Sequence, residues 1–186
     1  MTDRPSIVAF SGHMTDAPDR PKPRFPESHV ADVRERVRGV LQNLRGPLFG
    51  VSSAARGGDL VFIRSVLELG GTSIVLLPFP PADFKRTSVG QGWDPEFDEL
   101  VYSKRVDLRP PLHAACPSDA EAQNAAFAEC NDQIVDVAAK LIQSHGVTDA
   151  LFLALYKQTG ADALGGTMDA FERWKKTGGR LEIIEP

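Results

Sequence analysis

The chain has 186 residues, of which 42% are hydrophobic and 25% are charged, and its formal net charge is −4 at pH 7. This composition predicts one soluble globular domain over residues 1–186, and the acidic balance argues against non-specific binding to nucleic acid or to an anionic membrane. No apolar run approaches the roughly 20 residues that a membrane span needs, and the first residues do not resemble a signal peptide. Two cysteines are too few for a disulfide framework, so a reduced, cytoplasmic setting is expected.

The first half of the chain alternates apolar strands with helices. Strands are predicted at residues 6–10, 48–53 and 72–77. Apolar residues at helical spacing predict an amphipathic helix over 28–44, and a segment that is apolar nearly all round, 60–70, predicts a buried helix. Four prolines within residues 14–26 forbid a helix there and predict a long loop, and such loops are often functional.

The second half begins less regularly. Residues 82–93 look like a polar, basic loop, a helix is predicted over 94–106, and a short extended piece is predicted within 107–116. A long helix is predicted from 118 to 145, with a break near Cys130, followed by a strand at 150–155, an amphipathic helix and a last strand at 180–184.

Apolar strands that alternate with helices predict an α/β fold, namely a Rossmann-like, doubly wound and mainly parallel sheet flanked by helices. In such sheets ligands bind at the carboxyl ends of the strands, near the point where the strand order reverses. Three predicted strand ends carry glycine or other small residues, at 11–13, 52–59 and 160–167. We therefore expect a ligand site where these three ends meet.

The last of these strand ends has the features of an anion site. The strand that ends at Leu155 runs into a glycine-bearing loop, and Gly165, Gly166 and Thr167 then open a helix. Backbone N–H groups at a helix start lack intrahelical partners and lie at the positive end of the dipole, so they attract phosphate. Glycines allow close approach to the backbone and a threonine adds a hydroxyl donor, although a plain helix-start turn is the alternative.

The turn after the second strand is rich in polar donors. It consists of Ser52, Ser53, Ala54, Ala55, Arg56, Gly57, Gly58 and Asp59. Two serines and an arginine are more donors than a tight strand-to-helix turn requires, so ligand contact is favoured. The arginine is suited to a phosphate or a carboxylate, and a solvated side chain is the alternative.

Two further groups are candidates for ligand binding. Ser11, Gly12 and His13 follow the first strand, where the histidine could bond to a base or a ribose or could be structural. Lys85 and Arg86 could form a positive wall around phosphates or could be solvated charges.

Other chemistries find little support. His113 and Cys116 form one weak pair without a second pair at metal-ligand spacing, so no metal is expected. The sequence contains neither the Gly-x-Ser-x-Gly elbow of serine hydrolases nor the Gly-x-Gly-x-x-Gly fingerprint of dinucleotide enzymes, and no cofactor is expected.

The order of these motifs resembles the SLOG superfamily. The resemblance rests on a first strand ending in Ser-Gly-His, the turn SSAARGGD, an apolar strand ending in Leu-Pro and a late Gly-Gly-Thr helix start, and it is most specific over 52–78 and 160–174. The superfamily includes LOG phosphoribohydrolases, DprA-like proteins and ligand-sensing domains of TRPM channels and bacterial defence systems. The resemblance implies a Rossmann-like fold that binds a nucleotide or a nucleotide-derived ligand, with the glycines of all three strand ends near that ligand.

The resemblance also bears on catalysis. The LOG pattern Pro-Gly-Gly-x-Gly-Thr-x-x-Glu ends in a glutamate that, with an arginine, serves N-glycosidic cleavage, and this chain has Ala170 at that position. A ligand-sensing role is therefore the leading hypothesis. The alternative is a nucleoside 5′-monophosphate phosphoribohydrolase, in which Asp169 and Arg56 are the candidate catalytic residues, although an aspartate in a first helical turn also stabilises the dipole.

Further expectations follow from relatives. Asn131 matches an asparagine that recurs before the penultimate strand of related sequences, and a homodimer is expected by analogy. A nucleic-acid-binding module like the DprA relatives is a third hypothesis, against which the acidic charge and the lack of a basic stripe with aromatics argue.

Overall fold

The computed structural model describes residues 4–90, 92–148, 150–157 and 167–186, and for 167–169 it describes only the helix that they form. Its strands are β1 (Ser6–Gly12), β2 (Leu48–Ser52), β3 (Thr72–Val75), β4 (Val106–Leu108), β5 (Leu151–Leu155) and β6 (Arg180–Ile184). Its helices are the short 3₁₀ helix η1 (Glu27–His29), α1 (Val30–Gln42), α2 (Gly58–Glu68), α3 (Pro81–Ser88), α4 (Asp94–Val101), α5 (Ala120–His145) and α6 (Thr167–Lys175).

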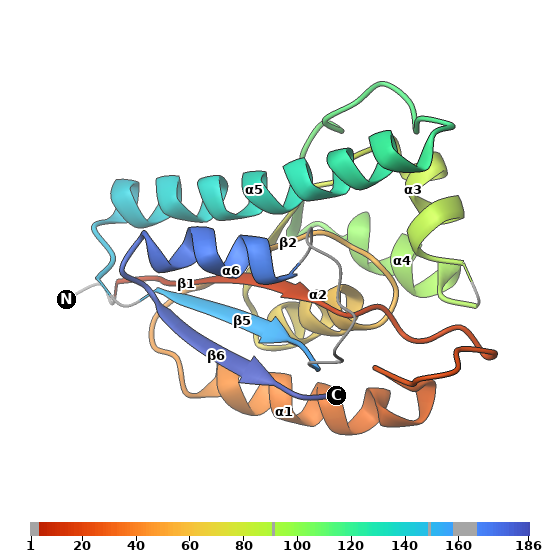
Figure 1. Ribbon diagram of the computed structural model, residues 1–186. Coiled ribbons are helices and arrows are strands. Elements are labelled where there is room, and N and C mark those ends of the chain that lie inside the picture. The colour runs from red at the N-terminus through yellow and green to blue at the C-terminus, as the bar shows by residue number, and fades with distance from the viewer. Residues whose placement is uncertain (1–3, 91, 149, 158–166) are drawn as a thin grey trace.

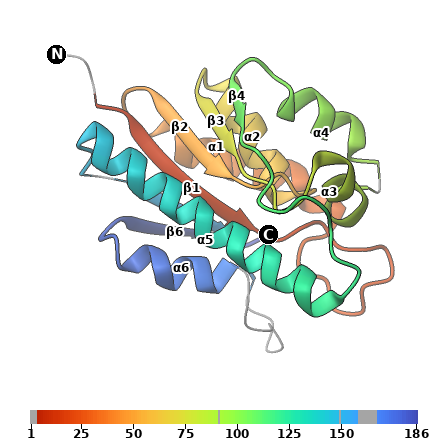
Figure 2. The same cartoon turned by 90° about the horizontal axis from the view of Figure 1, so that it is seen from above.

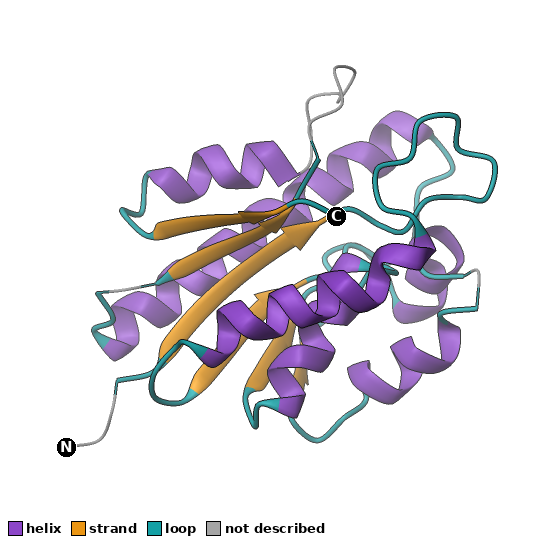
Figure 3. Cartoon of the chain, turned by 90° about the horizontal axis from the view of Figure 1, so that it is seen from below, coloured by secondary structure: helices purple, strands orange, loops and turns teal. Residues whose placement is uncertain are grey.

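The six strands form one parallel sheet in the order β4-β3-β2-β1-β5-β6. Helices α5 and α6 cover one face, as Figures 1 and 2 show, and Figure 3 shows from below the helices that cover the other face. Every residue of β5 is buried, as expected for a strand with a layer on both faces. The predicted Rossmann-like α/β fold is confirmed, and all the strand pairs are parallel.

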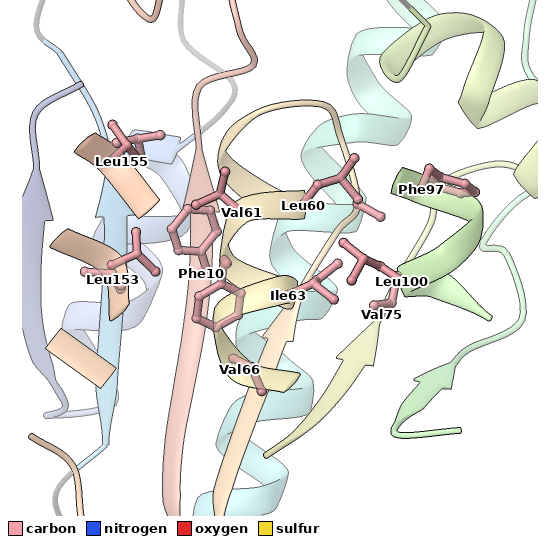
Figure 4. Packing of buried hydrophobic residues seen from close by; sticks show 14 of the residues in the cluster. Phe10, Leu60, Val61, Ile63, Val66, Val75, Phe97, Leu100, Leu153 and Leu155 are labelled. Carbon is pink, nitrogen blue, oxygen red and sulfur yellow. The ribbon is translucent and has the colours of Figure 1, made fainter. Parts of the chain in front are cut away.

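Side chains of β1 alternate between the two layers. Val8 and Phe10 enter the cluster that α1, α2 and α4 complete, whereas Ile7 and Ala9 enter the cluster on the side of α5 and α6. Phe10 stacks on Phe62 of α2 with ring centroids 4.6 Å apart. Figure 4 shows Phe10 between residues of α2 and the leucines of β5. The strand at the centre of the sheet is therefore anchored on both faces.

The strand order reverses beside β1. The chain passes from β1 to β2 on one side and returns through α5 to β5 on the other, so β1 pairs with both. The crossovers lie on opposite faces, which leaves a crevice at the carboxyl ends of the strands. The sheet thus has a strand reversal of the kind at which the sequence predicted a ligand site, and the site itself stays a prediction.

Three predictions about local structure are wrong. Residues 81–88 form helix α3 where a loop was expected, because Pro81 suits a first helical turn and Phe84 is buried. The helix predicted over 94–106 ends at Val101, and Val106 instead begins β4. Helix α5 continues without a break past Cys130, because its alanine-rich first half has high helix propensity.

None of the helices within these described ranges has the length and apolar character to cross a membrane.

Candidate functional site

A cavity of about 430 Å³ opens at the carboxyl ends of β1 and β2. Its walls come from the end of β1, the proline-rich loop 13–26, the turn after β2, helix α3 and the first half of α5. A hollow of about 670 Å³ between α1 and β6 is larger, but it lies at the edge of the sheet, away from the strand reversal. The cavity beside β1 has the size of a small-molecule site and the position in which parallel sheets bind ligands.

The end of β1 lies at this cavity. Ser11 and Gly12 line it, and Ser11 is buried. Gly12 is required for packing, because an added Cβ would lie 2.8 Å from Cβ of Leu155 and 2.9 Å from the ring of Phe10. Close packing of β1 against β5 thus explains the glycine without a ligand.

The turn after β2 divides into two parts. Ser53 and Asp59 line the cavity, whereas the Ser52 hydroxyl is fully buried and donates to the carbonyl of Ser53 at 2.8 Å. Gly57 has a φ of +81°, and a Cβ there would lie 2.6 Å from the backbone N of Thr15. The N–H of the next residue, Gly58, donates to the carbonyl of His13 at 3.2 Å, so both glycines lie where the turn packs against the loop after β1.

Arg56 joins three segments of the chain. Its Nε donates to the carbonyl of Thr15 at 3.2 Å, and its Nη1 donates to the carbonyl of Val89 at 3.2 Å. Its backbone N–H donates to the carbonyl of Ser88 at the end of α3. Arg56 does not line the cavity, and its catalytic role stays a prediction.

His13 contacts the loop after β5. Its Nε2 lies 3.1 Å from the backbone N and 3.3 Å from the carbonyl oxygen of Lys157, and its ring packs at a tilt against Tyr156 with centroids 5.2 Å apart. Its own N–H donates to the carbonyl of Leu155 at 3.0 Å. These contacts place His13 across the ends of β1 and β5, outside the cavity wall.

Helix α3 lines the cavity with residues other than the two cations that the sequence suggested. Phe84, Thr87 and Ser88 line it, as residues three or four positions apart share a helix face. Lys85 instead pairs with Asp98 of α4 at 2.7 Å. The side chain of Arg86 is 66% exposed and pairs with Asp83 at 2.9 Å. The two cations therefore do not form part of this cavity wall.

Arg24 is a lining residue that the sequence analysis missed. It lies in the proline-rich loop, where Oδ2 of Asp16 accepts the backbone N–H groups of Arg24 at 2.7 Å and Phe25 at 2.8 Å, and Phe25 is fully buried. The guanidinium of Arg24 is the one cation lining the cavity among the residues that the structure describes. The sequence could have indicated Arg24, since the proline-rich loop was expected to be functional and only a few of its residues are suited to bind an anion.

Helix α5 contributes amides and an aromatic ring. Asn124, Phe127 and Asn131 lie three and four positions apart and line the cavity together. This shared face exists because the helix is unbroken through its middle. Asn131 is thus placed at the cavity, in keeping with the residue singled out by the resemblance, whereas Asn124 carried no signal in the sequence.

Asp59 is a carboxyl group in a dry environment. Its side chain is in the first turn of α2, the residue is 7% exposed, and Oδ2 accepts the N–H of Ala55 at 3.0 Å. Burial raises the pKa of Asp59 to about 7, and the hydrogen bond from Ala55 offsets only part of this effect. The group therefore changes charge near neutral pH, which makes it a candidate acid or base.

Cys130, on the opposite wall, is a different kind of group. Burial, with a smaller contribution from the charge of Asp59, raises the pKa of the Cys130 thiol to about 12. A thiol that stays protonated is a poor nucleophile, so this cysteine serves as a small apolar wall residue.

The third predicted strand end is not tested. Gly165 and Gly166 lie outside the described residues. Thr167 is the first residue of α6 and Asp169 is in its first turn, but their side chains lie outside the description as well. In the described ranges, no group of three or more His, Cys, Asp or Glu side chains is placed to hold a metal ion.

Comparisons with known proteins do not assign the chain to a family. No protein-family model matches the sequence, and no curated protein matches it. DNA processing protein A (DprA) from Streptococcus pneumoniae superposes with a TM-score of 0.44 at 14% identity, covering 94% of this chain and 57% of that one. SuiB from Streptococcus suis bound to S-adenosylmethionine gives a TM-score of 0.30 at 11% identity, covering 96% of this chain and 38% of that one.

A second structure of SuiB gives a TM-score of 0.30 at 10% identity, covering 96% of this chain and 49% of that one. The chain thus spans well under two thirds of each of these proteins. Likenesses this distant carry no argument about function, so the functional conclusion depends on the cavity itself.

Proposed function

We propose that the chain binds a nucleotide or a nucleotide-derived ligand in the cavity beside β1, as a ligand-sensing domain of the SLOG type. The observation that carries the proposal is the position of the cavity at the strand reversal, with a cation, amides, hydroxyls and aromatic rings converging on one space. The motif resemblance described above points to the same class of ligand.

The wall is complementary to the parts of a nucleotide. Phe127 provides apolar surface for a base, and the Arg24 guanidinium suits a phosphate, which it can bind through two parallel hydrogen bonds. The hydroxyls of Ser11 and Ser53 and the amide of Asn131 are donors and acceptors for a ribose or a base edge. A volume of about 430 Å³ lies within the range of small-molecule sites.

Ligand sensing without turnover is the favoured mode. The position of the LOG glutamate is occupied by Ala170, which is 1% exposed and packs in the core on the side of α5. One observation favours the second candidate, a phosphoribohydrolase: Asp59 places a carboxyl group in the cavity, and such a group can act as an acid or a base.

The test is a thermal-shift panel of AMP, ADP, cyclic AMP and ADP-ribose, with chromatography of each nucleotide that binds. A ligand at a hundred times its Kd stabilises a protein by about 2.7 kcal/mol, which gives a clear rise in Tm. An intact bound nucleotide supports a sensor, whereas release of free base supports the phosphoribohydrolase.

A matched pair of variants ties binding to this cavity. Asn124→Trp places a large ring at the cavity wall from an exposed position of α5, and Ala125→Trp places the same ring on the next exposed residue, which does not line it. We expect the first variant to lose the shift and the second to keep it. Equal shifts for both variants would exclude this cavity as the site, and a panel without any shift would overturn the proposed function.

A further inference from the structure

Asp59 has one oxygen committed to the fold and one available to the cavity. Oδ2 accepts the N–H of Ala55, which closes the turn before α2. No described residue is hydrogen-bonded to Oδ1, although Asp59 is 93% buried and lines the cavity. An oxygen of a largely buried side chain at a cavity wall can be met by water or by a ligand.

Among the residues that the structure describes, the charged and titratable groups around Asp59 do not neutralise it. From its own turn, Arg56 directs its guanidinium to the carbonyls of two other segments, and His13, after β1, contacts the loop after β5. From α5, Cys130 stays a neutral thiol, and from the proline-rich loop Arg24 lines the same cavity. The dominant influence on the carboxyl group is therefore its burial.

We propose that Asp59 is a ligand-recognition acid: its protonated carboxyl group donates a hydrogen bond to an acceptor atom of the bound nucleotide, so binding takes up a proton. This inference rests on the proposed function and identifies the group that makes binding depend on pH. A ligand in the cavity displaces water from Asp59 and brings a phosphate near it, and both effects disfavour the carboxylate form. The proton comes from the solvent and stays on the carboxyl group while the ligand is bound.

The coupling of binding to protonation of Asp59 predicts in which direction, and by how much, the Kd changes with pH. Above the pKa of about 7 the free protein holds an ionised Asp59 that must be protonated on binding, so the Kd for an anionic nucleotide increases by up to about tenfold per pH unit. Below pH 6 the carboxyl group is already protonated and this dependence levels off. A carboxylate that binds a cationic ligand gives the opposite pH dependence, because its Kd decreases as pH rises.

The experiment uses AMP as the probe, with isothermal titration calorimetry between pH 6 and pH 8.5 in two buffers of different ionisation enthalpy. The ionisation of the phosphate itself, with a pKa of about 6, is common to all protein variants and cancels between them. The variants are Asp59→Asn, which keeps an acceptor for the Ala55 N–H, and Asp119→Asn as a control. Asp119 accepts the N–H of Ala122 at 2.8 Å at the start of α5, outside the cavity.

At pH 8 we expect the wild type and Asp119→Asn each to bind as much as about one more proton per AMP than Asp59→Asn does. Their Kd for AMP should also rise more steeply with pH. Equal proton uptake and equal slopes for the wild type and Asp59→Asn, with AMP bound, would overturn the inference and leave the proposed function intact. A wild type that binds AMP at no pH and shows no thermal shift with the other nucleotides of the panel would overturn the proposed function and this inference with it.

A second measurement does not depend on the variant. In the wild-type chain labelled with ¹³C at the aspartate carboxyl groups, the apparent pKa of Asp59 should be higher with saturating AMP than without it. An apparent pKa that is unchanged or lower with AMP would contradict proton uptake by this group even if Asp59→Asn failed to fold.

Discussion

Gly12 and Leu155 pair in register at the ends of β1 and β5, so close together that a Cβ on the glycine would lie 2.8 Å from Cβ of the leucine. This contact joins the two strands between which the sheet order reverses. It brings the residues that directly follow β1 and β5 together beside the candidate site, where His13 contacts Lys157. The site is therefore built on one of the tightest contacts of the sheet.

Replacing Gly12 with alanine should destabilise the fold. The new methyl group overlaps Leu155 and the ring of Phe10, and overpacking of this kind costs about 1–3 kcal/mol. Urea denaturation measures the loss. In Gly39→Ala, the matched change within helix α1, an added Cβ meets no atom within 4 Å, so that variant should gain up to about 1 kcal/mol. Equal stability changes in the two variants would contradict the tight packing at the strand reversal.

Gly57→Ala should be more damaging than an alanine at another left-handed glycine. At Gly57 the positive φ is combined with a Cβ position 2.6 Å from the backbone N of Thr15, so backbone must move. Gly178, with a φ of +74°, has no atom within 4 Å of an added Cβ, and Gly178→Ala pays only the conformational cost of roughly 1 kcal/mol.

The difference between the urea midpoints of Gly57→Ala and Gly178→Ala measures the destabilisation that comes from the contact between Gly57 and the loop after β1. Nucleotide binding should also weaken in Gly57→Ala and persist in Gly178→Ala. Equal stabilities of Gly57→Ala and Gly178→Ala would contradict the close packing of the turn against this loop.

Asp59 should make stability depend on pH. Its pKa is raised in the folded chain from 3.8 to about 7, so the folded state holds a proton that the unfolded state has released. The free energy of unfolding contributed by this group therefore falls as pH rises from about 4 to about 7, by up to about 1.4 kcal/mol per unit, and is level above that. Asp59→Asn should lack this component and gain roughly 3 kcal/mol relative to the wild type between pH 5 and pH 8.

Urea unfolding at pH 5 and pH 8 checks this prediction without any ligand. If the wild type and Asp59→Asn lost stability in parallel, the carboxyl group would not be titrating in a desolvated site.

Arg24→Gln should weaken binding of AMP without changing the fold. A hydrogen bond to a charged group contributes about 1.5–3 kcal/mol, so the Kd should rise by roughly 10- to 100-fold at pH 6.5. The loop itself should keep its shape, because Asp16 holds it through backbone N–H groups. Arg109→Gln is the control, since Arg109 pairs with Asp107 and lies outside the cavity.

Calorimetric Kd values for AMP measure both changes. A Kd that moved equally in both variants would indicate a general charge effect, and the role of Arg24 at the phosphate would then be refuted.

Much of the fold was determined by the sequence alone. The apolar runs of β1, β2, β3 and β5 predicted a parallel sheet with two covered faces, because only strands buried on both sides lack alternating polar residues. The strand ends with Ser11, Gly12, Ser53 and Asp59 were recognised in the sequence, and the structure places those four residues at one cavity. The roles of Gly165, Gly166, Thr167 and Asp169 stay predictions.

Only the tertiary structure decided which of the polar residues share that cavity. Lys85 and Arg86 looked suited to phosphate, but acidic side chains on α4 and α3 pair with them, and Phe84 turns the other face of α3 inward. Arg24 reaches the cavity because Asp16 and the buried Phe25 fix its loop, and the charge of Asp59 depends on how completely its neighbours exclude water. Contacts between different elements, such as that of Lys85 on α3 with Asp98 on α4, decide these outcomes, and the pattern within a single element does not specify them.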